Sequence, residues 1–341
     1  MTDRALGHLS DTLLLAAVVV YALAMLGFAA DQASRRARKV VGAGARTARA
    51  AKAVPARVLV GAGGPPVAER PAAAGAAPVD GPARRGVSGT LAVALTVAGA
   101  SVHLGSVLTR GLAAHRVPWG NMYEFSSTVA FAAVTVFLVC LARGRLDRSV
   151  GAFVMLPVVL YLGLAGTVLY TGAEPLLPAL DSYWIKIHVA AAIVSSGAFL
   201  LSGVVALLFL LRSRYDGLLQ ERRPLRFPTT LGAALPAAPA LDRAAYAVIA
   251  FAFPVWTFAI IAGAIWAESA WGRYWGWDPK ETWSFITWVL YAGYLHARST
   301  AGWKGRKAAW VAVAAAVALV IDYYVVNIFV VGIHSYAGIK P

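Results

Sequence analysis

Eight stretches of about 20 mostly apolar residues recur along this chain of 341 residues, and this repetition constrains its fold more than any other feature. A bilayer core about 30 Å thick is crossed by roughly 20 apolar residues in a helix. With 59% apolar and 14% charged residues, the composition excludes an ordinary soluble enzyme. The sequence therefore predicts an all-α, polytopic membrane protein with about eight transmembrane helices, near 10–30, 88–109, 121–142, 149–171, 186–211, 243–266, 283–300 and 307–331.

The net charge of +15 indicates membrane topology rather than a nucleic-acid partner. Loops rich in Lys and Arg stay in the cytoplasm. Of the 31 Lys and Arg, eleven lie in residues 31–86, and three, six and four lie in the loops near 143–148, 212–243 and 297–307. The alternate loops and the two ends hold the other seven. We therefore expect both termini outside and residues 31–86 inside.

Composition divides the chain into three parts. Residues 1–30 are predicted to form a retained transmembrane anchor, because Arg residues follow the apolar run and no small-residue cleavage site is evident. Residues 31–86, rich in Ala, Gly, Pro and Arg, are predicted to be a disordered cytoplasmic linker. Residues 87–341 are predicted to form a membrane domain of seven helices. The single cysteine, Cys140, excludes an internal disulfide and a thiol relay.

Six of the eleven tryptophans lie between positions 266 and 288, in a segment predicted to face the outside. Trp271, Trp275 and Trp277 stand among glycines and a proline, which suit a shaped loop. Flat indole faces stack well on a flat conjugated ring. An aromatic belt at the membrane surface also explains a tryptophan cluster. Composition leaves both interpretations open.

Two histidines are predicted on the same outer side as this loop. His188 follows an outer loop and lies in the first turns of its helix, and His334 lies just beyond the last helix. Two neutral imidazoles on opposite faces of a planar macrocycle are a standard ligand set for haem iron. A helix-end histidine satisfied by water or a carbonyl remains the alternative for each residue taken alone.

His296 differs because it lies 15 residues after Glu281 on one predicted helix, about 22 Å deeper in the membrane. A histidine there is a candidate haem ligand or proton relay, and a second ligand would have to come from another chain. The alternative is a residue that caps carbonyls at the helix end. His103 is expected to bond a neighbouring helix, and His8 and His115 are expected to be solvated.

Four charged residues complete the candidates. Asp322 lies within the last helix, where a structural pair and a proton path are both open. Glu124, in the segment RVPWGNMYEF, is expected to cap a helix. Arg273 and Lys280 suit the acidic groups of a ligand such as haem propionates, although loop solubility explains them equally well.

The segment WGRYWGWDPKETW resembles the WWD signature of haem-handling proteins for cytochrome c assembly, in particular the CcsA/ResC family, called CcsB in some lineages. The likeness extends through RVPWGNMYEF, LPALDSYWIKIHV, WVLYAGYLHAR and VNIFVVGIHSYA, and so covers the chain from about residue 100 onward. The N-terminal third matches no pattern of the family.

The resemblance implies c-type cytochrome biogenesis, in which haem b is carried outward and attached through thioether bonds to the CxxCH segment of apocytochrome c. It implies a ResB-type haem-handling partner and a thioredoxin-like thiol reductant, in the plasma membrane of a bacterium, with the active face outside. It maps the outer iron ligands to His188 and His334 and the transmembrane iron ligand to His296, whose haem takes its second ligand from the partner. The expected haem-binding residues are Trp266, Trp271, Arg273, Trp275, Trp277, Asp278, Glu281 and Trp283.

No residue of the chain is expected to act as a nucleophile, since the thiols come from the apocytochrome. Whether the chain is an enzyme stays open: the resemblance makes it part of a holocytochrome c synthase complex. A haem exporter or chaperone without catalysis, and a b-type haem electron carrier, are the alternatives.

Overall fold

The computed structural model describes residues 2–52, 87–173, 182–300 and 302–334, and all regular structure in these ranges is helical. The helices are α1 (Asp3–Lys52), α2 (Val87–Ala114), α3 (Met122–Ala142), η1 (Arg148–Val150), α4 (Gly151–Val168), α5 (Tyr183–Gln220), η3 (Thr229–Ala234), α6 (Ala238–Trp271), α7 (Pro279–Thr300), α8 (Arg306–Val320), η4 (Ile321–Val326) and α9 (Asn327–Phe329). The all-α prediction is confirmed.

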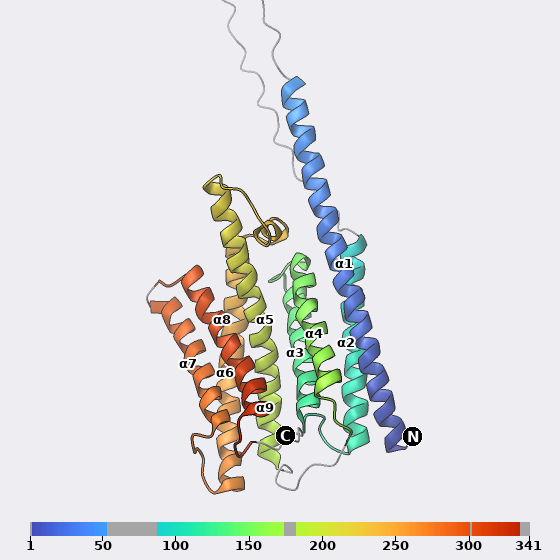
Figure 1. The fold of residues 1–341 in the computed structure, drawn as a ribbon, viewed down its shortest axis with the longest axis vertical. Coiled ribbons are helices and arrows are strands. Elements are labelled where there is room, and N and C mark those ends of the chain that lie inside the picture. Colours follow the sequence, from blue (N-terminus) through green and yellow to red (C-terminus); the bar gives the residue numbers. More distant parts are fainter. Residues whose placement is uncertain (1, 53–86, 174–181, 301, 335–341) are drawn as a thin grey trace, which may run out of the picture.

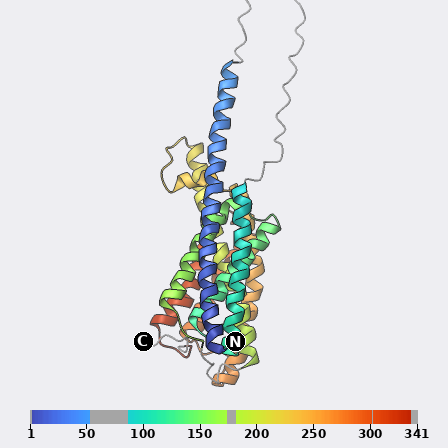
Figure 2. The same ribbon diagram turned by 90° about the vertical axis from the view of Figure 1, so that its right-hand side faces the viewer.

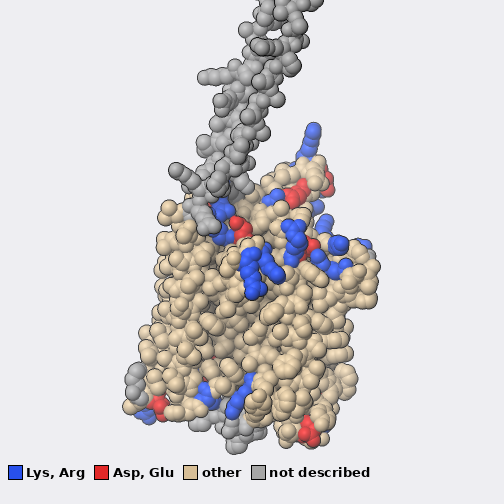
Figure 3. Space-filling view, turned by 180° about the vertical axis from the view of Figure 1, so that it is seen from behind, with Lys and Arg blue, Asp and Glu red and all other residues tan. Residues whose placement is uncertain are grey.

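The eight long helices run alternately up and down beside one another (Figure 1). The loops predicted to lie outside therefore meet at one end of the bundle, the lower end in Figure 1, and the loops predicted to lie inside meet at the other. On the face drawn in Figure 3, most Lys and Arg lie toward the upper end, a few lie at the lower end, and an uncharged band separates them. Such a band is what a bilayer requires of a lipid-facing surface.

Seven of the described helices, rather than eight, are long and apolar enough to cross a membrane. The predicted span 283–300 is present as α7, but α7 is not among the seven. The reason is its polar content, which includes Lys280, Glu281, His296 and Arg298. Helix α7 nevertheless packs against α6 and α8 within the bundle.

Helix α1 continues without interruption past residue 30, where the first boundary was predicted, to Lys52, and the division of the chain into three parts stays a prediction. Residues 31–52 are rich in Ala and Arg, which have among the highest helix propensities, so a helix that begins in the membrane can propagate through them. The rest of the predicted linker, 53–86, lies outside the described residues. Helix α1 packs along α2 and α4, and Figure 2 shows α1 and α2 side by side in front of the other helices.

Helix α5 occupies the centre of the fold and contacts α3, α6 and α8. Its 38 residues span about 57 Å, so it extends well beyond the predicted 186–211 and beyond a bilayer core. Gly197 allows α3 to approach closely, since a Cβ there would lie 2.7 Å from the backbone nitrogen of Ala133. Helix α5 also packs along α6, and the main cavity lies beside the N-terminal turns of α5 and the C-terminal turns of α6.

Candidate functional site

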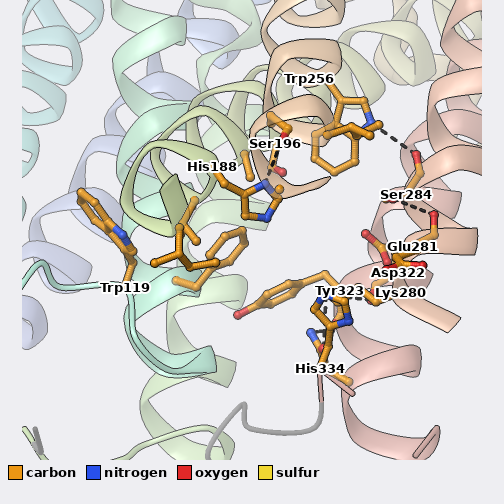
Figure 4. Close-up of a pocket in the computed structure, with 18 of the residues that line it drawn as sticks. Trp119, His188, Ser196, Trp256, Lys280, Glu281, Ser284, Asp322, Tyr323 and His334 are labelled. Carbon is orange, nitrogen blue, oxygen red and sulfur yellow. Dashed lines mark hydrogen bonds between the residues drawn. The ribbon is translucent and has the colours of Figure 1, made fainter. Parts of the chain in front are cut away.

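A cavity of about 220 Å³ lies at the end of the bundle where the loops predicted to be outside meet. The beginnings of α3, α5 and α7, the end of α6, and η4 with α9 contribute to its walls. Most of the lining side chains are apolar or aromatic. Both predicted outer histidines, His188 and His334, line it, although 146 residues separate them in the sequence (Figure 4).

The loop between α6 and α7 is shaped by local sequence signals. Helix α6 ends at Gly272, whose φ of 70° is the left-handed conformation that glycine adopts at helix C-termini. Asp278 caps α7 by accepting a hydrogen bond from the Lys280 N–H, and the Glu281 carboxylate reaches back to the N–H groups of Asp278 at 3.0 Å and Gly276 at 2.8 Å. With Pro279 at the first helical position, this is a capping box. Hydrogen bonds within and next to the motif WDPKE thus determine the conformation of the loop before α7.

Asp278 also orients His334. The Nδ1 atom of His334 lies 2.8 Å from Asp278 Oδ2, and the other carboxylate oxygen accepts from the Ile333 N–H at 2.9 Å. An ionised carboxylate only accepts, so Nδ1 carries the proton, and a neutral His334 has its lone pair on Nε2. A carboxylate behind the imidazole is the common arrangement for a histidine that ligates a metal.

The surroundings of this pair favour a neutral imidazole beside an ionised carboxylate. Burial lowers the pKa of His334 below its ordinary value of 6.5, although the hydrogen bond to Asp278 opposes this shift. Burial acts to raise the pKa of Asp278, but the hydrogen bonds from Ile333 and His334 outweigh it, so that pKa lies below its usual 3.8. Iron binding requires a neutral imidazole, and His334 is therefore suited to it at neutral pH.

His188 is held in the same way by a different acceptor. Its Nδ1 donates to the carbonyl oxygen of Ala259 on α6, at 2.7 Å, which leaves the lone pair on Nε2. The imidazole packs against Gly263, where a Cβ would lie only 2.7 Å from Nδ1. The contact therefore requires glycine at position 263, one helical turn after Ala259.

The predicted haem-binding tryptophans divide into two groups. Trp266, Trp271 and Trp275 line the cavity, and Trp271 meets the ring of His334 edge to face at 4.9 Å between centroids. Trp277, Trp283 and Arg273 do not line it. Trp277 is 64% exposed and packs against Trp275 and Phe285 on the outer side of the loop. Of the two predicted acidic residues, Glu281 lines the cavity, while Asp278 contacts His334 from behind.

His296 lies far from this cavity. It is exposed near the opposite end of α7, where its carbonyl oxygen accepts hydrogen bonds from Ser299 and Thr300. The nearby Arg298 forms a bidentate ion pair with Asp242 on α6, at 2.6 and 2.9 Å. The side chain of His296 is therefore accessible on the surface of the described bundle.

The remaining histidines behave as predicted. His103 is fully buried and its ring nitrogens contact Ser127 of α3 at 2.9 Å and Tyr21 of α1 at 3.4 Å, which confirms a bond to neighbouring helices. His8 and His115 are exposed.

Asp322 is buried in the π-helical turn η4, as Figure 4 shows beside Lys280. The Lys280 ammonium lies 3.2 Å from the Asn327 side-chain oxygen and 3.4 Å from the Asp322 carbonyl oxygen. Lys280 of the WWD segment thus contacts the backbone of Asp322, whereas the carboxylate atom Oδ1 of Asp322 is buried without a hydrogen-bond partner in the described part of the chain. Single π-helical turns within α-helices are frequent at functional sites.

Several cavity residues were not among the predicted site residues. Trp119, Trp256 and Tyr323 line the wall; Trp119 and Tyr323 are distant in sequence from the WWD loop, and Trp256 lies on α6, the helix that leads into it. The segment RVPWGNMYEF was predicted to hold a helix cap and carries part of the family resemblance, but Trp119 was not among the predicted site residues. Glu124 does accept from the Gly120 N–H, as a capping residue does, but it also binds Arg110 and Arg116. No periodicity in the sequence reveals this convergence.

The fold and the cavity define a polytopic membrane protein with two prepared histidines in a tryptophan-lined site. Comparison with known proteins gives the family. A model described as "Cytochrome C assembly protein" matches residues 119–334, more than half of the chain. The chain belongs to this family.

The relatives agree with this assignment. The "Cytochrome c biogenesis protein CcsA" of a Picosynechococcus species is 33% identical over 297 residues, which cover 73% of this chain and 87% of the relative. The proteins of the same description from Microcystis aeruginosa and Gloeobacter violaceus are 35% and 33% identical, and the matches cover 67% and 69% of this chain and 81% and 83% of theirs. The chain is thus a multi-pass membrane protein of cytochrome c biogenesis, a role that involves haem and apocytochrome c.

Proposed function

We propose that the chain holds haem b in the outer cavity between His188 and His334 and presents it for covalent attachment to the CxxCH segment of apocytochrome c. One observation carries the proposal: two imidazoles from distant parts of the chain line one largely apolar cavity, each with its Nδ1 proton given to a fixed acceptor. Trp266, Trp271 and Trp275 supply aromatic surface suited to a planar macrocycle.

The proposed attachment needs no nucleophile from this chain. A thiol of the CxxCH segment adds across a haem vinyl group: the S–H and C=C π bonds break, sulfur bonds to the α-carbon, and the proton goes to the β-carbon. The addition is balanced without an external oxidant or reductant. The chain contributes by holding the haem in a dry site beside the peptide, which lowers the entropic barrier to the reaction. The histidine of CxxCH then displaces one of the two iron ligands.

The proposal includes further components. A thioredoxin-like reductant keeps the CxxCH cysteines as thiols. A ResB-type partner contributes the second ligand to a haem at His296, and the accessibility of this side chain on the bundle surface suits such an arrangement. The cavity end is proposed to face outward across the plasma membrane of a bacterium, because 24 of the 31 Lys and Arg lie in the segments predicted for the other end, and the face drawn in Figure 3 shows the same bias.

The test uses visible spectra of the purified full-length chain with haem b, with and without reductant. His188→Ala and His334→Ala are expected to lose the bis-histidine spectrum and to regain part of it with free imidazole. His115→Ala, at an exposed histidine outside the cavity, serves as the control. An unchanged haem content in both cavity variants contradicts the ligand assignment.

Two further measurements separate the proposed roles. Coexpression with the ResB-type partner and a CxxCH acceptor, followed by detection of covalently bound haem, distinguishes a synthase from a haem carrier. His296→Ala is expected to remove a second haem of the complex while the outer haem stays. Loss of both haems together would contradict two separate sites.

A further inference from the structure

The segment 116–121 forms a wall of the cavity that the WWD loop does not provide. Val117, Trp119, Gly120 and Asn121 all line the cavity. In Figure 4, Trp119 lies on one side of His188, and Lys280 and Glu281 lie on the other. A planar ligand between the two histidines would therefore meet the WWD segment along one edge and Trp119 along another.

A buried group of charges holds this segment in position. Arg116 forms two hydrogen bonds with the Glu124 carboxylate, at 2.6 and 3.1 Å, and Arg110 approaches the same carboxylate through Nε at 3.0 Å. The Gly120 N–H donates to Glu124 Oε2 at 2.9 Å, next to Trp119 in the chain. The side chains of Glu124, Arg110 and Arg116 are 1%, 4% and 8% exposed.

The second acid of this group comes from the N-terminal helix, outside the residues that match the family model. Asp11 of α1 lies 3.6 Å from Arg110 and accepts a hydrogen bond from the Tyr170 hydroxyl at 2.7 Å. Two arginines thus face two carboxylates, so the group is neutral overall. Arg110 also donates to the Thr171 carbonyl, which joins the loop after α4 to the same group.

A helix cap alone does not require this arrangement. The side chain of Asn121 already caps α3 by accepting from the Glu124 N–H at 2.8 Å. Buried ion pairs stabilise a fold only weakly, because desolvation offsets most of their attraction, whereas they do fix geometry when every partner is in place. The group therefore serves to fix the position of the segment that carries Trp119.

We propose that Trp119 is a haem-contacting residue of the outer cavity and that Glu124, with Arg110 and Arg116, is the positioning group that holds it there. This inference rests on the proposed function and adds to it a second aromatic wall, which the segment between α2 and α3 provides. The ligand class is a planar conjugated macrocycle, which an indole contacts through its face or edge.

The test is a titration of the purified full-length chain with haem b, followed by absorbance. Trp119→Ala is expected to weaken binding about tenfold, equivalent to about 1.4 kcal/mol. Trp119→Phe is expected to recover most of this loss, because it keeps an aromatic surface. Trp310→Ala is the control, since Trp310 is 57% exposed on α8 and does not line the cavity.

The positioning role is tested by combining substitutions. Arg116→Gln and Glu124→Gln are each expected to weaken binding by a similar factor, and to weaken it no further in a chain that already carries Trp119→Ala. A purely structural role would instead give losses that add. If the Glu124→Gln variant does not fold, the positioning role is tested by Arg116→Gln alone and combined with Trp119→Ala.

The outcomes separate this inference from the proposed function. If Trp119→Ala binds haem as tightly as the parent while His188→Ala loses haem, Trp119 is not a haem contact, and the proposed outer site stands without it. Parental affinity in His188→Ala and His334→Ala overturns the proposed function itself. Additive losses for Arg116→Gln and Trp119→Ala overturn the positioning role alone.

Discussion

Gly263→Ala tests the geometry of the outer site most directly, because it adds one methyl group against the imidazole of His188. The new Cβ would lie 2.7 Å from Nδ1 and 2.8 Å from Cε1. Ordinary van der Waals contact begins near 3.4 Å, so the ring has to retreat by about 0.7 Å. Ligand geometry tolerates displacements of only about 0.5 Å.

The displacement also strains the hydrogen bond that fixes the ring. His188 Nδ1 and the Ala259 carbonyl oxygen are 2.7 Å apart, and hydrogen bonds weaken beyond about 3.2 Å. Overpacking costs about 1–3 kcal/mol, and the hydrogen bond contributes about 1 kcal/mol. Alanine favours a helix over glycine by about 0.5–1 kcal/mol, which offsets part of this cost. We therefore expect Gly263→Ala to lower the free energy of unfolding by about 1–3 kcal/mol and to weaken haem binding, with partial recovery in free imidazole.

The assay pairs thermal unfolding of the purified chain with a haem titration. Gly166→Ala in α4 is the matched control, since a Cβ there meets nothing within 4 Å and alanine favours a helix by about 0.5–1 kcal/mol over glycine. Haem affinity and unfolding temperature equal to those of the parent in Gly263→Ala would refute the proposed packing of His188. A loss of stability without a loss of haem would show that His188 does not ligate.

Two further predictions concern other histidines. Asp278→Asn is expected to weaken outer haem binding about 10–100-fold, because it removes the carboxylate that orients His334. In the haem-free chain, burial holds the pKa of His334 below 6.5 and Asp278 opposes that shift, so Asp278→Asn is expected to lower this pKa further, as the imidazole resonances of His334 against pH would show. A rise of the pKa of His334 would be inconsistent with this electrostatic role. His103→Ala should lower the free energy of unfolding by about 2–4 kcal/mol, since it leaves a cavity and unpairs Ser127 and Tyr21, while haem bound per folded chain stays the same; a changed spectrum would argue against a structural role.

Local signals in the sequence were sufficient to predict where the long helices lie. Apolar stretches of membrane-spanning length predicted eight long helices, and all eight are present near the predicted positions. The exceptions have local causes as well. Helix α1 runs on to Lys52 because Ala and Arg continue a helix in water, and α7 misses the hydropathy of a membrane span because it carries His296 and Arg298.

The candidate site was predictable only in part. His188 and His334 were paired from topology, since alternation of the helices puts both at the same end of the bundle. The resemblance to the WWD family added eight residues of that segment as expected haem contacts, whereas Trp277 is exposed and does not line the cavity. Asp278 lies behind His334, an arrangement that the order of residues along a chain does not reveal.

The sequence by itself determined what depends on neighbours within a few residues: the apolar helices, the end of α6 at Gly272, and the capping box of Asp278 and Glu281. Only the tertiary structure decided which side chains share the cavity. Trp119, Gly263 and His334 come from three separate elements and meet there because α3 and α6 pack around α5. Hydropathy and helix propensity act along the chain, whereas such convergence depends on how helices pack in three dimensions.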